Sequence, residues 1–217
     1  MFQNCTSLTQ APELPATKLA TSCYKSMFSG CSSLTQAPVL PVMTLVNGCY
    51  SYMFENCTTL TQAPVLPATT LIRNCYQSMF KGCTSLTQAP ALPATDLTYD
   101  YNCYDSMFYG CTSLTQAPEL PATTLATYCY SNMFSGCTSL TQAPALPATT
   151  LDSYCYNAMF SGCTKLNNIN VNFSVWNPTN ATTSWVSNVA SSGTFTCPAN
   201  LPREYGNNRI PNGWTVV

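Results

Sequence analysis

The chain has 217 residues, of which 46% are apolar and only 7% are charged, and its net charge is −1. This length and apolar content are enough to bury a continuous core, so we expect one elongated domain. Seven Lys or Arg against eight Asp or Glu leave no basic stripe for phosphates, which argues against nucleic acid and anionic lipid surfaces as partners.

A near-constant unit, Cys-Tyr-x-x-Met-Phe-x-Gly/Asn-Cys-x-x-Leu-Thr-Gln-Ala-Pro-x-Leu-Pro, runs along three quarters of the chain. Its Met-Phe pairs begin at residues 1, 27, 53, 79, 107, 133 and 159, so five of six steps are 26 residues and one is 28. A fixed period of this size predicts a solenoid of stacked units. We assign residues 1–169 to the solenoid, with six full units and flanking part-units. Residues 170–217 are assigned to a C-terminal capping segment.

The solenoid is expected to be N-terminally incomplete, because the chain starts at the Met-Phe of a unit. Further repeats before Met1, or self-association at this edge, would cover the first unit. No apolar run approaches the roughly 20 residues of a membrane-spanning helix, so no membrane insertion is expected in this chain. No signal peptide precedes Met1; we interpret the N-terminus as a processed, trimmed or fragment boundary, so the absent signal says little about location.

A short helix is expected in each unit. In residues 23–28 the apolar side chains recur at i, i+1, i+4 and i+5, which gathers them on one helical face. Capping residues stand before it, and Asn or Gly follows two residues after each Phe, as a left-handed stop. The caps are Ser22, Asn47, Asn74, Asn102, Thr127 and Ser153, and the stops are Asn4, Gly30, Asn56, Gly82, Gly110, Gly136 and Gly162.

A short parallel strand is expected next, over Leu-Thr-Gln-Ala-Pro. Proline has no N–H to donate, so it limits each strand to roughly five residues. The following Leu-Pro-Ala-Thr-x-Leu run is expected to be an extended return path, with Leu14 and Leu19 and their equivalents in the core. The fold class is therefore an α/β repeat solenoid, with one short parallel strand and one short helix per unit of about 26 residues and a C-terminal cap.

The repeat decays from about Lys165, and an exposed sheet edge would remain there. Residues 170–217 are expected to cover it, with large apolar plugs, a short helix around residues 183–190 and a final turn and strand. The plugs are Trp176, Trp185 and Trp214.

Fourteen cysteines invite a disulfide or metal interpretation. Eight residues separate Cys23 from Cys31, roughly 12 Å along a helix, which is too far for a bridge within one unit. The chain has no His and no Cys-x-x-Cys, so neither metal nor cofactor is expected. We favour buried free thiols in two columns, with sporadic disulfides between adjacent units as the alternative.

Enzymatic activity is not expected. The absence of His excludes the usual Ser-His-Asp and Cys-His arrangements, and no phosphate-binding loop is present. Carboxylates cluster only at Asp96, Asp100 and Asp105, beside the unit that is longer by two residues. A carboxylate pair can do acid/base work, but a solvated bulge in a repeat is the favoured interpretation.

Two candidate binding surfaces remain. The first is the column that follows Ala-Pro, which varies between units while the neighbouring Gln residues form a structural ladder. The second is the start of the expected helix, where aromatic rings replace small polar residues and could contact a sugar or a protein. Packing on neighbouring side chains is the alternative for these rings. The column is Glu13, Val39, Val65, Ala91, Glu119 and Ala145, and the rings are Tyr99, Tyr101, Tyr128 and Tyr154.

The recurrent Met-Phe-x-Gly-Cys-Thr-Ser-Leu-Thr pattern resembles the BspA-like leucine-rich repeats, also described as the Treponema pallidum type. Phe28, Cys31, Leu34 and Ala37 occupy the places that match that family's motif, and the resemblance covers residues 1 to about 170. It departs from the family in carrying Ala where Ile is common and in adding Leu-Pro-Ala-Thr-Thr-Leu.

The resemblance implies a bacterial, non-catalytic protein, extracellular or on the cell surface. Adhesion to, or recognition of, a protein or glycan on a host or bacterial surface is the function it implies. The alternative is a structural spacer or assembly subunit of a larger surface or phage particle. An enzyme of carbohydrate metabolism ranks third.

Overall fold

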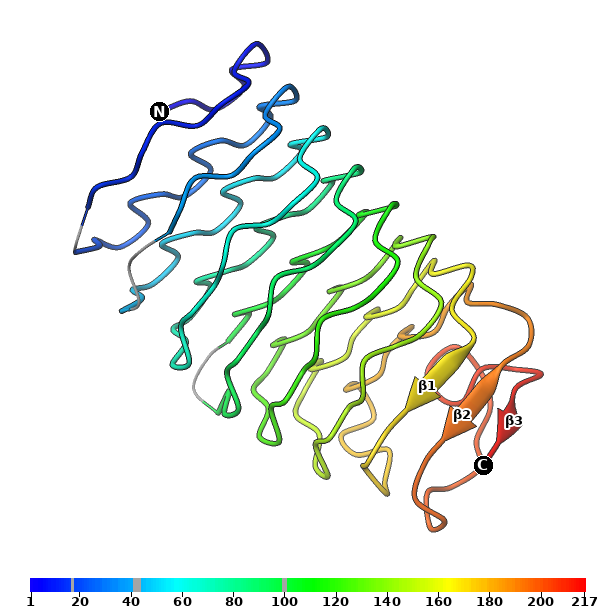
Figure 1. Ribbon diagram of the computed structural model, residues 1–217. Coiled ribbons are helices and arrows are strands. Elements are labelled where there is room, and N and C mark those ends of the chain that lie inside the picture. The colour runs from blue at the N-terminus through cyan, green and yellow to red at the C-terminus, as the bar shows by residue number, and fades with distance from the viewer. Residues whose placement is uncertain (17, 41–43, 99–100) are drawn as a thin grey trace.

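The computed structural model describes residues 1–16, 18–40, 44–98 and 101–217. The chain winds into a stack of similar coils, one per unit, with the two termini at opposite ends of the stack (Figure 1). The expected repeat solenoid is therefore confirmed.

Three short strands lie at the C-terminal end of the stack (Figure 1). They are β1 (Asn168–Asn170), β2 (Thr194–Thr196) and β3 (Thr215–Val216), in the order β1-β2-β3. Both pairings are parallel, and Ile169 lies opposite Phe195. The final turn and strand expected at the C-terminus correspond to β3.

In the preceding units, the described residues form isolated parallel bridges where strands of about five residues were expected. Successive Gln residues pair across the units: Gln10, Gln36, Gln62, Gln88 and Gln116, and then Gln142 with Asn168. The parallel alignment is confirmed, but the strand length is wrong. Proline two residues after each Gln removes the next donor, so the pairing cannot extend in that direction.

The helix expected in each unit is wrong, because the described residues contain no helix. Residues 22–31 instead form consecutive tight turns. Their backbone N–H groups alternate between two kinds of acceptor. The N–H of each odd-numbered residue bonds to the carbonyl three residues earlier, as from Met27 to Tyr24 (3.2 Å). The N–H of each even-numbered residue bonds to a carbonyl of the next unit, as from Phe28 to Met53 (3.0 Å). We call this segment and its equivalents the turn ladder.

Positive φ angles explain why the turn ladder cannot be helical. They recur at every fourth residue, with 57° at Ser22, 54° at Ser26 and 75° at Gly30. A right-handed helix excludes such angles, whereas the third residue of a type II turn requires them. The left-handed conformation expected at the Asn/Gly stops is confirmed, but Ser22, Asn74 and Asn102 adopt it too, so they are not helix caps.

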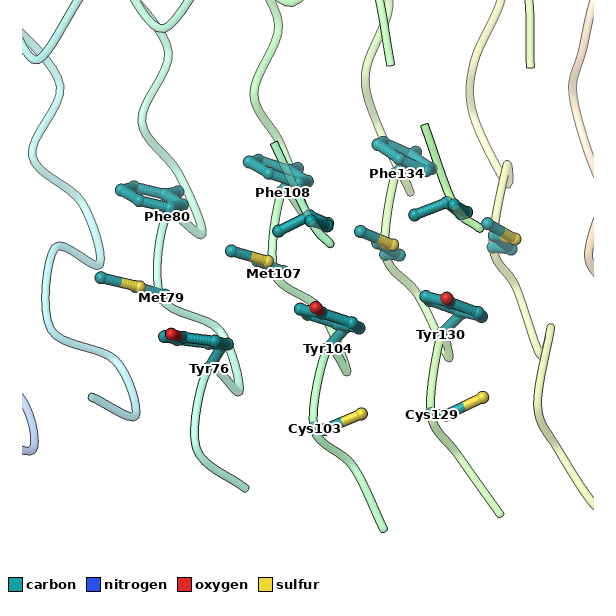
Figure 2. Close-up of a cluster of buried hydrophobic side chains, with 14 of the residues drawn as sticks. Tyr76, Met79, Phe80, Cys103, Tyr104, Met107, Phe108, Cys129, Tyr130 and Phe134 are labelled. Atoms are coloured by element: carbon teal, nitrogen blue, oxygen red, sulfur yellow. The ribbon is translucent and has the colours of Figure 1, made fainter. Parts of the chain in front are cut away.

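Identical side chains stack in columns inside the coil, as Figure 2 shows for three Phe and three Tyr residues. Successive Phe rings from Phe2 to Phe160 are 5.7 to 5.8 Å apart between centroids. Successive rings of the Cys-Tyr pairs, from Tyr24 to Tyr156, are 5.7 to 6.1 Å apart. The core is thus one continuous stack, which links each unit only to its neighbours.

The C-terminal segment first adds another coil and then closes it. The Phe160 N–H bonds to the Trp185 carbonyl (2.8 Å), so residues 181–188 continue the turn ladder and the short helix expected around residues 183–190 is wrong. Residues 207 and 208 then receive its outward N–H groups: the Asn208 side chain accepts the Ser184 N–H (2.7 Å), and the Asn207 carbonyl oxygen accepts the Val186 N–H (3.2 Å). The three Trp plugs are buried, as expected. The division between residues 169 and 170 stays a prediction.

Candidate binding surfaces

Eleven of the fourteen cysteines are buried, as expected for thiols that act as small hydrophobic side chains. Those that follow the Asn/Gly stop also donate a hydrogen bond: the Cys57 thiol lies 3.1 Å from the Phe28 carbonyl oxygen of the preceding unit. Burial raises the pKa of the Cys57 thiol to about 12, so it stays protonated at neutral pH. The described residues hold no group of three or more His, Cys, Asp or Glu that could bind a metal ion.

The acidic cluster falls partly outside the described residues, since Asp100 is one of those omitted. Asp96 is exposed, and its Oδ1 accepts hydrogen bonds from the hydroxyls of Thr98 and Thr124, which hold its pKa at about 2. Asp105 instead accepts the Gln77 amide (3.0 Å) within the turn ladder, and burial raises its pKa. The two carboxylates thus belong to separate hydrogen-bond networks.

The described tyrosine candidates, Tyr101, Tyr128 and Tyr154, lie where their turn ladders begin. Tyr99 lies outside the described residues. Tyr101 is 49% exposed and Tyr128 is 37% exposed, whereas Tyr154 is half-buried. The rings of Tyr128 and Tyr154 stack on each other at 4.7 Å between centroids and an interplanar angle of 1°. Two of the expected residues are therefore brought together, and we call this pair the tyrosine pair.

Both members of the tyrosine pair adopt the left-handed conformation, with φ of 59° at Tyr128 and 56° at Tyr154. Small residues hold the equivalent positions in earlier units, namely Ser22, Gly48, Asn74 and Asn102. Positive φ is uncommon for a bulky residue and costs free energy. Because φ is positive at this position in every unit, the backbone there favours Gly or Asn, and the two tyrosines are present despite that preference.

A groove of about 480 Å³ lies on the edge that carries the tyrosines, and sequence reasoning missed it. Arg73 lines it and precedes Asn74, whose N–H bonds to the Tyr101 carbonyl oxygen (3.1 Å), so the groove and Tyr101 are neighbours. Polar, charged and aliphatic residues together line it. Its lining is Asn47, Thr69, Thr70, Leu71, Ile72, Arg73, Asp96 and Thr98.

Two further aromatic residues were missed, Tyr52 and Tyr109. The Lys25 ammonium lies 5.9 Å from the Tyr52 ring centroid, and the Lys81 ammonium lies 5.7 Å from that of Tyr109. Both rings occupy turn-ladder positions at which the other units carry no aromatic residue, so a comparison of the units could have found them.

The variable column after Ala-Pro lies on a surface built from prolines. We call the column and its flanking prolines the proline face. All six column members are exposed, and Val39 and Val65 are 79% and 78% exposed. Two equivalent grooves open on this face, one of about 280 Å³ beside Glu13 and one of about 270 Å³ beside Glu119.

The Gln column runs beside the proline face, and its residues are exposed. Its parallel bridges support the expected structural role. A polar groove of about 450 Å³ crosses it between two units, lined by Thr115, Gln116, Ala117, Thr141, Gln142, Ala143 and Pro144.

Comparison with known families confirms the resemblance seen in the sequence. Six copies of the BspA type leucine rich repeat region match residues 1–103 and 102–201. No curated protein matches the chain. Within the described residues, no helix is long and apolar enough to cross a bilayer. The matched residues cover most of the chain, which therefore belongs to the BspA type leucine-rich repeat family.

Proposed function

We propose that this chain is a non-catalytic binding protein at the cell surface, which recognises a protein or glycan on a host or bacterial surface. Membership of the BspA type leucine-rich repeat family is consistent with a protein-binding role at a surface. The partner is contacted by side chains at those repeat positions that differ from one unit to the next.

The tyrosine pair is the observation that carries this proposal. A stack of two partly exposed rings offers a rigid, flat aromatic surface, and aromatic side chains dominate the energetics of protein interfaces. The two rings cover each other's inner faces, and Tyr128 remains 37% exposed for contact with a partner. Tyrosine is present at both positions although their positive φ favours Gly or Asn, so we attribute its presence there to a role in binding.

The groove beside Tyr101 adds polar groups to the same edge. Arg73 and Asp96 offer charges of both signs, and three threonines also line the groove. This combination of an aromatic side chain and a groove with polar and apolar lining suits a partner that presents both hydroxyl and apolar surfaces, as sugars and protein loops do.

A structural spacer or assembly subunit is the second candidate function. The observation that favours it is the unbroken stack of Phe rings and inter-unit hydrogen bonds, which makes a stiff rod. In this case the tyrosines would serve only packing.

The test combines a glycan array with a panel of purified extracellular-matrix proteins, probed with the labelled chain, while light scattering follows its oligomeric state. Binding to at least one member by a monomer supports recognition. Failure of every member, together with ordered self-assembly, would replace it with the spacer or assembly function.

A further inference from the structure

The proline face carries charge of one sign at two equivalent places. Glu13 and Glu119 are both exposed, and each lies in its own proline-lined groove. The ion pairs of the described residues are Lys81 with Glu55 and Arg209 with Glu204, so neither groove carboxylate is neutralised by one. No Lys or Arg occurs in the column itself.

Each groove offers a carboxylate beside an apolar wall. Pro12, Pro15 and Pro38 line the first, and Pro118, Pro121 and Pro144 line the second in equivalent positions. A lysine or arginine has the complementary shape, with an aliphatic stem that packs on apolar surface and a cationic end. Both grooves thus fit a basic side chain.

The surface between the grooves is apolar. Val39, Val65 and Ala91 are the column members between Glu13 and Glu119, and all three are exposed. Two adjacent valines that are nearly four-fifths exposed are unusual for a solvated face, because burying a valine side chain stabilises by about 1.5–3 kcal/mol. A partner with apolar side chains between its basic ones would cover them.

The spacing of the two carboxylates sets the register of the partner. Glu13 and Glu119 are four units apart, which at about 4.8 Å per unit is about 19 Å. An extended peptide advances about 3.3 Å per residue, so about six residues span that distance. Positions i and i+6 lie on the same face of an extended chain, as do i+2 and i+4.

From this geometry we infer that the proline face binds an extended peptide segment along the solenoid axis, with basic residues at i and i+6 and apolar residues at i+2 and i+4. The basic ends enter the two grooves, and the apolar side chains lie over Val39, Val65 and Ala91. Prolines leave few backbone donors on this face, so side chains carry the recognition. The inference rests on the proposed binding function and names a partner class for a second surface.

The test measures fluorescence anisotropy of a labelled peptide, Lys-Ser-Val-Ser-Val-Ser-Lys, against the whole chain. The permuted peptide Lys-Lys-Val-Ser-Val-Ser-Ser has the same composition and charge but places the two lysines together. We expect the first peptide to bind more tightly than the second. Equal affinities, or no binding of either, would overturn the inference.

Variants of the chain separate the grooves from general electrostatics. E13Q and E119Q should each weaken binding of the first peptide about threefold, the size expected for one exposed ion pair. The matched control E55Q removes the same charge from the turn ladder and should change nothing. The double variant E119A/A145E keeps the net charge but moves one carboxylate by a unit, and it should weaken binding as much as E119Q. An unchanged affinity in that variant would contradict the assigned register.

Failure of these peptides leaves the proposed function standing if the glycan and matrix-protein panel still binds through the tyrosine edge. Failure of the panel alone, with peptide binding intact, would confine recognition to the proline face. The two outcomes are therefore distinguishable.

Discussion

The Cys83 thiol donates a hydrogen bond to the Phe54 carbonyl oxygen, which belongs to the preceding unit and lies 3.1 Å away. That oxygen also accepts the backbone N–H of Cys57 (3.0 Å), so both of its lone pairs are used. The same arrangement recurs in successive units, and each thiol thus ties two coils together.

Replacing this thiol should therefore destabilise the solenoid. We expect C83A to lower the free energy of unfolding by about 1–2 kcal/mol, because a buried hydrogen bond is lost and a small void is left. C5A is the matched control, since Cys5 belongs to the same column but is exposed, and it should change stability by less than about 0.5 kcal/mol. Urea denaturation of both variants is the measurement. Equal effects would contradict the assigned role.

Alkaline pH should weaken the fold. Burial raises the pKa of the Cys57, Cys155 and Cys163 thiols to about 12, whereas an unfolded thiol ionises near about 8.5. The folded chain then holds more protons than the unfolded chain, so this stabilisation is complete below about pH 8.5 and declines as the pH rises toward about 12. The midpoint of urea denaturation, measured at pH 7.5, 9 and 10, should fall as the pH rises. A C57A variant should show a smaller decline, and a flat profile would refute the burial argument.

Gly82 should tolerate a side chain less well than Gly110. Both have positive φ, 74° and 71°, so alanine costs roughly 1–2 kcal/mol at either position. At Gly82 the new Cβ would also meet the Asn56 Oδ1, so that Asn56 must leave its rotamer at a further cost of about 0.5–1.5 kcal/mol.

The double variant N56G/G82A removes that collision. The free energy of unfolding that N56G/G82A loses relative to N56G alone should match the loss that G110A shows relative to the parent. At Gly110 the atom nearest to a new Cβ is the Gly82 Cα, at 3.9 Å. Thermal or urea unfolding of G82A, N56G, N56G/G82A and G110A measures these differences in stability. If G82A costs as much stability in the N56G background as in the parent, the contact with Asn56 does not cause the extra loss at Gly82.

Tyr128 provides a test of function against packing. Y128N should leave the free energy of unfolding within about 1 kcal/mol of the parent, because relief of the positive φ offsets the lost ring stack, worth about 0.5–1.5 kcal/mol. Asn already holds the equivalent position at Asn74 and Asn102. A loss above about 2 kcal/mol would mean that the ring is there for packing.

The sequence predicted the column structure well, because the period alone determines which residues stack. The side chains of Leu14 and Cys31 were expected in the core and are buried, whereas Leu19 is only partly buried. The family assignment followed from the repeated motif. The assignment of residues 170–217 to a cap stays a prediction, and the contact of the Asn208 side chain with the Ser184 N–H depends on a side-chain hydrogen bond that no pattern encodes.

Periodicity alone could not distinguish a helix from the turns that the structure shows in each unit. Apolar residues at i, i+1, i+4 and i+5 fit one face of a helix, but they equally fit turns that repeat every four residues. Ser22 and Ser26 reveal the difference only through their φ angles. The groove beside Tyr101 was missed because residues from successive units, around 69–73 and 96–98, form it together.

The most direct measurement is the affinity of the chain for a partner identified by the glycan and matrix-protein panel, compared with the Y128S/Y154S double variant. Tyr205, which is 52% exposed in the capping segment, provides the control Y205S. We predict that the double variant binds at least tenfold more weakly, as expected when a central aromatic contact worth more than about 1.4 kcal/mol is removed, and that Y205S binds as the parent does. Unchanged affinity in Y128S/Y154S would contradict the assignment of recognition to the tyrosine pair.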